Sequence, residues 1–295
     1  MAYRLKGQKP IATELSRIVA REFEKALEEL RDHRDHGGEA VHEARKSVKK
    51  IRAVLRLLRK DLGSHYQTEN QRLRKIAHEL SPLRDVDAAT EIVKSVRKRY
   101  PDLISRSVFS SARRGFVARK RGAAARADSA RLLPRAAHEL RQSSTPTVRR
   151  IRRVAGHAAL ITGIRRGYRR AVRAMAEVHA QPEDACFHAW RRRVKDHWYH
   201  VRLLEGFHAR ARHRAQELKR LETWLGDDHN LVLIRQTILN TPERFGDHRA
   251  TTLVLGCVAK YQTTLRRRAL KLGNRLFRPR PGEFRRSIDT WLSGH

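Results

Sequence analysis

Apolar residues recur at the spacing of an α-helix along almost the whole chain, and this periodicity limits the fold more than any other feature of the sequence. Alternating apolar and polar runs bounded by turn residues, the pattern of β-strands, are missing. Turn-forming pairs interrupt the helical pattern at intervals, for example Gly37-Gly38, Gln181-Pro182 and Thr241-Pro242. The sequence therefore predicts an all-α fold.

The two halves of the chain repeat each other on either side of a polar stretch from Gln142 to Thr147, which we interpret as a linker. With an offset of 146 residues, the residues of one basic segment fall on similar residues of a second: His42 on His188, Arg45 on Arg191, Lys49 on Lys195 and Arg56 on Arg202. A shared order of elements at a nearly constant offset is typical of an internal duplication. We therefore expect two pseudo-symmetric antiparallel helical bundles, residues 1–145 and 146–295.

The first basic segment, residues 41–62, is strongly amphipathic when drawn as a helix. Its cationic face spans roughly 80° of the helix circumference. That face is formed by His42, Arg45, Lys49, Arg52 and Arg56, with Lys46 and Lys50 on its flank. The opposite face is apolar, and no acidic residue stands between Arg45 and Lys60.

The second basic segment has the same design with fewer cations. One face carries His188, Arg191, Lys195 and Arg202, and Arg192 lies beside them. Asp196 and Trp198 occupy the positions that correspond to Lys50 and Arg52, so the second ridge is less cationic, and the sequence leaves open whether the two halves bind equally.

The charge balance predicts an anionic partner. The chain has 66 Lys and Arg against 31 Asp and Glu, a formal net charge of +35. Neighbouring like charges destabilise a helix, so a cationic ridge without acidic partners favours ligand binding over the alternative of a merely solvated face. Cations at every turn match a linear polymer of phosphates better than a small metabolite.

Non-specific binding of DNA or RNA is the alternative function, because a very basic chain is typical of nucleic-acid binders. No helix-turn-helix or zinc-finger pattern is found. Aromatic residues make up only 6% and are not interleaved with the basic stripes, which disfavours a stacking platform for single strands.

The basic segments resemble the CHAD family, the conserved histidine α-helical domains, through the repeated His-x-x-Arg-x-x-x-Lys pattern. Two later segments are similar to the acidic motif of that family: Leu83-Arg84-Asp85-x-Asp87 and Leu225-Gly226-Asp227-Asp228. The resemblance implies two helical bundles around a basic central groove that binds inorganic polyphosphate. Members of that family are often fused to a CYTH triphosphatase domain, but no Glu-x-Glu-x-Lys motif of that domain is found here, so we expect a stand-alone CHAD protein. The resemblance also suggests a location at polyphosphate granules in the cytoplasm.

Catalytic and metal motifs are not apparent, so we expect a binding protein without a cofactor or metal. Metal binding by His42 and His188 is disfavoured by the cations beside them, which also favour neutral imidazoles in the free protein. The acidic residues Asp85, Asp87, Asp227 and Asp228 are expected to give structural support, as helix caps or as partners of basic side chains.

A membrane location is not expected. The N-terminus lacks the apolar core of a signal peptide. The longest uncharged stretch, residues 154–164, is too short to cross a bilayer. Two cysteines, Cys186 and Cys257, are too few for a disulfide framework and suggest reduced thiols in the cytoplasm.

Overall fold

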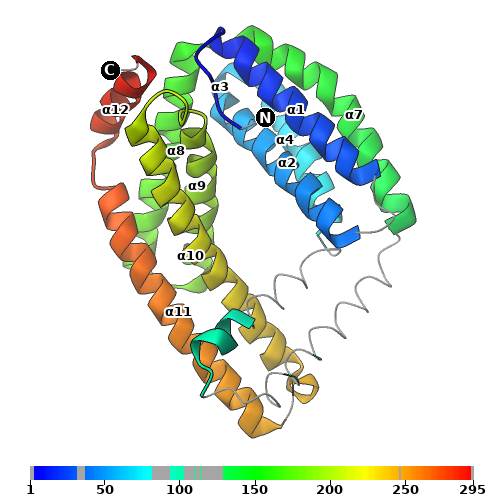
Figure 1. Cartoon of the computed structure of the whole chain (residues 1–295), viewed down its shortest axis with the longest axis vertical. Coiled ribbons are helices and arrows are strands. Elements are labelled where there is room, and N and C mark those ends of the chain that lie inside the picture. The colour runs from blue at the N-terminus through cyan, green and yellow to red at the C-terminus, as the bar shows by residue number, and fades with distance from the viewer. Residues whose placement is uncertain are drawn as a thin grey trace.

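The described part of the chain is built from helices, as Figure 1 shows. The structure is a computed structural model, and it describes residues 3–31, 37–81, 94–102, 110, 114, 129–245 and 247–293. No strand occurs within these ranges. The prediction of an all-α fold is therefore confirmed.

Two groups of helices follow each other along the chain. The first group consists of α1 (Ile11–Arg31), α2 (Gly37–Leu57), α3 (Arg59–Leu62), α4 (Ser64–Glu79) and α7 (Ser129–Val154). The second consists of α8 (His157–Ala180), α9 (Asp184–Arg202), α10 (Ala209–Asn240), the 3-10 helix η1 (Pro242–Arg244), α11 (His248–Leu276) and α12 (Pro281–Ser293). The basic segment expected at residues 41–62 is divided, because α2 ends at Leu57 and the short α3 follows it.

The two basic helices, α2 and α9, occupy the middle of the molecule. Helix α2 packs against α1 and α4, and α9 packs between α8 and α10. Helix α2 also contacts both α8 and α9, so the two groups meet along the basic helices. In Figure 1 the first group and the second group lie side by side, with α7 and α11 toward the outside.

A single apolar core joins the two groups. Val48, Ile51 and Leu55 of α2 are fully buried, as are Trp190 and Val194 of α9, and all five belong to one cluster. Burial of each such side chain contributes about 1.5–3 kcal/mol to stability. The apolar stripe read from the sequence is thus the face that holds the basic helices in place.

The prediction of a linker at residues 142–147 is wrong, because this stretch lies inside α7. Its Ser and Thr residues resemble a loop, but four residues at helical spacing form a buried stripe: Leu140, Ser143, Thr147 and Ile151. Helix α7 packs this side against α1 and continues to Val154. The division of the chain into residues 1–145 and 146–295 stays a prediction, although its boundary falls within a helix.

The positions at which helices begin support the predicted repeat. Helix α1 begins at Ile11 and α8 at His157, which are 146 residues apart. Helices α4 and α10 begin at Ser64 and Ala209, at nearly the same offset. In each group the basic helix lies between these two helices in the sequence: α2 follows α1 and precedes α4, and α9 follows α8 and precedes α10.

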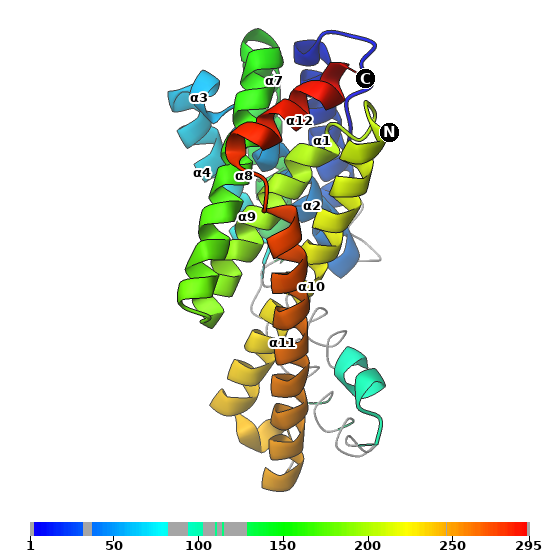
Figure 2. The ribbon, with the colours of Figure 1, turned by 90° about the vertical axis from the view of Figure 1, so that its left-hand side faces the viewer.

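Helices α10 and α11 extend beyond the other helices, which is clearest in Figure 2. A second apolar cluster, including Leu231, Ile234 and Val258, joins their extended ends. Val96, in the short helical segment 94–99, also belongs to this cluster. None of the described helices is both long and apolar enough to cross a membrane.

Helix α8 approaches α2 and α9 closely at two glycines one turn apart. A Cβ atom on Gly163 would lie 2.2 Å from the backbone oxygen of Leu57. A Cβ atom on Gly167 would lie 2.7 Å from Nδ1 of His200. The absence of a side chain at both positions therefore sets the distance between α8 and the basic helices.

We predict that Gly163→Ala lowers the free energy of unfolding by about 1–3 kcal/mol, since the methyl group has no space and the helices must separate. The control is Gly256→Ala in α11, where the new methyl group would meet no atom within 4 Å beyond the nearby backbone of its own helix. That substitution should stabilise the protein by up to about 1 kcal/mol through helix propensity. Urea denaturation measures both values, and equal effects of the two variants would contradict the close packing of α8.

Candidate polyanion-binding pocket

A cationic pocket of about 400 Å³ lies where α2, α4 and α9 meet. Its lining contains eight cationic side chains and one carboxylate. The lining residues are Lys49, Arg52, Arg56, Asn70, Arg74, Arg191, Arg192, Arg193, Lys195, Asp196 and Tyr199. We call this cavity the basic pocket.

Helix α2 presents Lys49, Arg52 and Arg56 to the basic pocket. Their spacing of three and four residues places them on one face, opposite the buried apolar stripe. The Nε atom of Arg52 donates a hydrogen bond to Oδ1 of Asn70 in α4, at 3.1 Å. The Nη1 atom of Arg56 donates to Oδ1 of Asp196 in α9, at 2.9 Å. These two contacts connect the three helices that form the pocket.

Helix α9 contributes Lys195, whose charge is balanced from behind the pocket. Its Nζ atom lies 2.7 Å from Oε1 of the buried Glu222 in α10, and Lys219 donates to the other oxygen of that carboxylate at 2.8 Å. Burial alone would raise the pKa of Glu222, but the two ammonium groups hold it at about 2. Glu222 is therefore ionised and fixes the position of the Lys195 side chain.

Two cations of the basic pocket, Arg52 and Lys195, are held in an unfavourable environment. Burial, followed by repulsion from Arg56, lowers the pKa of Arg52 to about 10. Burial also lowers the pKa of Lys195, although Glu222 opposes this effect. An anion placed among these groups would relieve both the repulsion and the lost hydration.

Six of the twelve residues that we expected to bind polyphosphate line the basic pocket: Lys49, Arg52, Arg56, Arg191, Arg192 and Lys195. The other six, His42, Arg45, Lys46, Lys50, His188 and Arg202, lie outside its lining. Arg45 is buried and donates to Oγ of Ser81 at 2.7 Å. The guanidinium group of Arg202 lies over the ring of Trp198, 5.0 Å from its centroid.

Neighbouring acids pair with part of the cationic ridge, so the expectation of a ridge without acidic partners is wrong. Lys50 lies 2.8 Å from the buried Glu22 of α1, and Lys46 lies 2.9 Å from Glu43 on its own helix. The Nε2 atom of His42 is 4.0 Å from the same Glu43 carboxylate. A helical wheel of α2 alone misses Glu22, because that acid comes from another helix.

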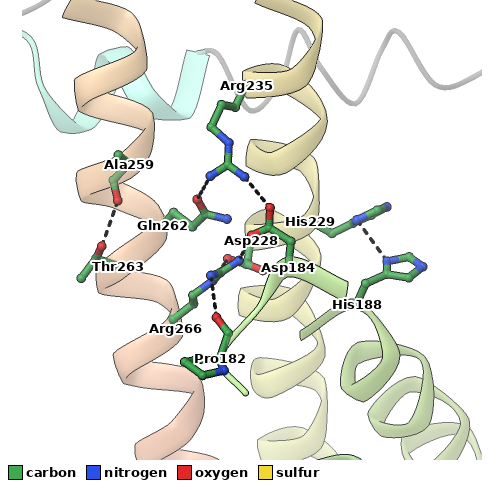
Figure 3. Close-up of polar contacts among 10 residues, drawn as sticks. All are labelled: Pro182, Asp184, His188, Asp228, His229, Arg235, Ala259, Gln262, Thr263 and Arg266. Atoms are coloured by element: carbon green, nitrogen blue, oxygen red, sulfur yellow. Dashed lines mark hydrogen bonds and ion pairs between the residues drawn. The ribbon is translucent and has the colours of Figure 1, made fainter. Parts of the chain in front are cut away.

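His188 and His229 form a pair near the start of α9, as Figure 3 shows. Their Nδ1 atoms are 3.1 Å apart, a distance at which one imidazole donates to the other. Burial lowers the pKa of both rings, and the nearby arginines Arg191 and Arg192 lower it further. The pKa of His229 falls to about 4, so this ring is neutral at physiological pH.

The acidic pair Asp227 and Asp228 does not cap a helix, because both residues lie in the interior of α10. Asp228 is buried and accepts a hydrogen bond from Nε of Arg266 in α11, at 2.7 Å. Arg266 also pairs with Asp184 at the start of α9, as does Arg235 of α10 (Figure 3). Asp228 thus takes part in a network that joins α9, α10 and α11.

Asp227 lies in a different environment, where burial and the nearby Glu222 raise its pKa to about 6. The other two predicted support residues, Asp85 and Asp87, lie outside the described residues.

Arg74 and Arg193 line the basic pocket but were not predicted as ligand-binding residues. Arg74 comes from α4, whose sequence lacks a continuous basic face. Arg193 follows Arg191 and Arg192 directly, and a run of three adjacent cations could have indicated it. Consecutive side chains of a helix are rotated by about 100° from one another. The positions of the neighbouring helices therefore decide which of them face a cavity.

A second cavity, of about 330 Å³, lies between α10 and α11 and holds none of the predicted residues. It is lined by Arg220, Trp224, Arg268, Lys271, Leu272 and Arg275. Its cations come from other helices than those of the basic pocket, which makes them suitable for control substitutions.

Comparison with known proteins relates the chain to a family. A family model described as the CHAD domain matches residues 18–239, about three quarters of the chain. No curated protein and no solved structure matches the chain. The matched range includes both basic helices and every residue that lines the basic pocket. The chain therefore belongs to the CHAD domain family.

Proposed function

We propose that the basic pocket binds inorganic polyphosphate and performs no chemistry on it. The observation that carries this proposal is the convergence of eight cations from α2, α4 and α9 around one carboxylate. Membership of the CHAD family supports the choice of ligand, because that family binds polyphosphate.

The chemistry of the lining suits phosphate oxygens. Six of the eight cations are arginines, whose planar groups donate two parallel hydrogen bonds to a phosphate. They come from three helices rather than from one turn, so they can contact successive phosphates of a chain. A single orthophosphate would leave most of these donors without a partner.

Catalysis is not part of the proposal because the two lining residues that could act as a base, Asp196 and Tyr199, are not available for that role. Asp196, the one carboxylate of the lining, is paired with Arg56 at 2.9 Å. Burial raises the pKa of Tyr199, so its hydroxyl stays protonated. A water molecule attacking a phosphoanhydride would need a base, and the described lining offers none that is free.

We predict that labelled long-chain polyphosphate binds in preference to nucleic acid at near-physiological salt. In a competition titration, duplex DNA, single-stranded RNA and pyrophosphate should each displace it poorly at equal phosphate concentration. Efficient displacement by DNA or RNA would show that the protein is a general polyanion or nucleic-acid binder. Efficient displacement by pyrophosphate would show a site for a short ligand.

We predict that Arg74→Glu combined with Arg192→Glu weakens polyphosphate binding by about 100-fold, since each lost charged contact costs about tenfold in affinity. Both side chains are exposed, so helicity measured by circular dichroism should not change. Arg45 is a poor choice for this test because it is buried.

The matched control is Arg268→Glu combined with Lys271→Glu, which changes the net charge equally but alters the other cavity. Binding should then weaken by no more than about threefold through the general field. If both double variants lose affinity equally, the basic pocket is not the binding site.

We also predict a steep dependence of affinity on salt, because each phosphate contact releases counterions. Eight contacts would give a slope of roughly −6 for log K against log salt concentration, using the value for single-stranded nucleic acids. The Arg74→Glu and Arg192→Glu variant should show a shallower slope by about 1–2. Isothermal titration at several salt concentrations measures the slope, and a slope near zero would contradict the proposal.

A further inference from the structure

We propose that the junction of α2, α8 and α9 holds a second phosphate subsite, which continues from the basic pocket and is used only by long polyphosphate chains. This inference rests on the proposed function. The subsite consists of Arg166 and Arg170 of α8 and Arg193 of α9, and it is separated from the rest of the pocket by Asp196.

A small cleft at this junction connects directly with the basic pocket. It is lined by Arg56, Gly163, Arg166, Gly167, Arg170, Arg193, Asp196 and His200. Three of these residues, Arg56, Arg193 and Asp196, also line the basic pocket. Cationic side chains of α2, α8 and α9 therefore line two adjoining cavities, with Asp196 in the wall that they share.

The close approach of α8 brings its arginines to this junction. Gly163 and Gly167 allow the helix to rest on Leu57 and His200, as described above. Arg166 and Arg170 lie on the same face as these glycines, since three and four residues make about one turn. The first group has no equivalent, because with the 146-residue offset the corresponding positions in α1 are Ala20 and Glu24.

The arginines of the subsite lack acidic partners within the described part of the chain. No described carboxylate lies within 4.0 Å of Arg166, Arg170 or Arg193, although Asp196 lines the same cleft. Burial, followed by repulsion from Arg193, lowers the pKa of Arg170. Three half-exposed guanidinium groups with these properties favour an anion at the mouth of the cleft.

A buried histidine gives a second, independent indication of a ligand. His200 is 2% exposed and lines the cleft. Its Nε2 atom must donate to the backbone oxygen of Ala53, at 3.0 Å, so Nδ1 carries the lone pair. That Nδ1 atom has no hydrogen-bond partner among the described residues. The cavity volume of about 10 Å³ suits one water molecule, which could donate to Nδ1 and to a phosphate at the mouth.

Asp196 controls passage between the two sites. Its carboxylate pairs with Arg56 and is the one acidic group in the lining of both cavities. A phosphate chain that crosses this point must compete for Arg56 and approach a negative charge. A short chain avoids this cost by staying in the basic pocket, whereas a long chain offsets it through the arginines of α8.

The test compares tripolyphosphate with long-chain polyphosphate at constant ionic strength, using the full chain. For Arg166→Gln combined with Arg170→Gln, we expect the affinity for the long chain to fall about tenfold. The affinity for tripolyphosphate should stay within about twofold. The control, Arg268→Gln combined with Lys271→Gln, should change both affinities by no more than about twofold. Equal losses for the two ligands, or no loss for either, would overturn the second subsite.

A gain of affinity excludes misfolding as an explanation. Asp196→Asn should strengthen binding of the long chain more than binding of tripolyphosphate, by about threefold or more. This difference should disappear when Arg166→Gln and Arg170→Gln are added. If it persists, Asp196 acts on the basic pocket alone. If the unmodified protein binds neither phosphate ligand, the proposed function fails, which is distinct from failure of the subsite.

Discussion

Two buried carboxylates hold each basic helix against a neighbouring helix of its own group. Glu22 of α1 holds Lys50, and Glu222 of α10 holds Lys195, with both acids nearly inaccessible to solvent. Removal of either acid would leave a cation at a helix interface without a partner, which is costly. Other cations of α2 and α9 line the basic pocket, among them Lys49, Arg52 and Arg192. The scarce acids of a very basic chain thus fix the scaffold and leave the basic pocket cationic.

The two halves use the same helix order for different tasks. Lys50 in the first half pairs with an acid of its own group, whereas the corresponding Asp196 in the second half pairs across to Arg56. The cross-pair connects α2 to α9 and also places the one carboxylate inside the basic pocket. If the halves arose by duplication, this substitution converted a position of internal support into a contact between halves. On the proposed function, the asymmetry is then part of the binding surface and not a loss of function in the second half.

Helical periodicity predicted the fold class and the two basic helices, because the burial of an apolar stripe dominates their placement. It failed at residues 142–147, where buried Ser143 and Thr147 resemble a loop in composition but occupy core positions of α7. Half of the expected binding residues line the basic pocket, and their role in binding stays a prediction. The position of the others could not be foreseen for one physical reason: a helical wheel gives the direction of a side chain but not the helix opposite it. Whether Lys50 meets Glu22 or open space depends on tertiary packing, which one helix does not encode.

The repulsion within the basic pocket links binding to stability. Burial and the charge of Arg56 lower the pKa of Arg52 to about 10, which means that the folded state disfavours the charged guanidinium compared with water. This cost is present whenever the protein is folded and unoccupied, and the apolar core beneath α2 and α9 must offset it. On the proposed function, a polyanion that binds the folded pocket more tightly than the unfolded chain would relieve the repulsion and stabilise the fold, with a gain that grows with the logarithm of its concentration. The same cations that weaken the free protein would then supply the affinity, and neutral side chains at these positions would improve stability while reducing binding.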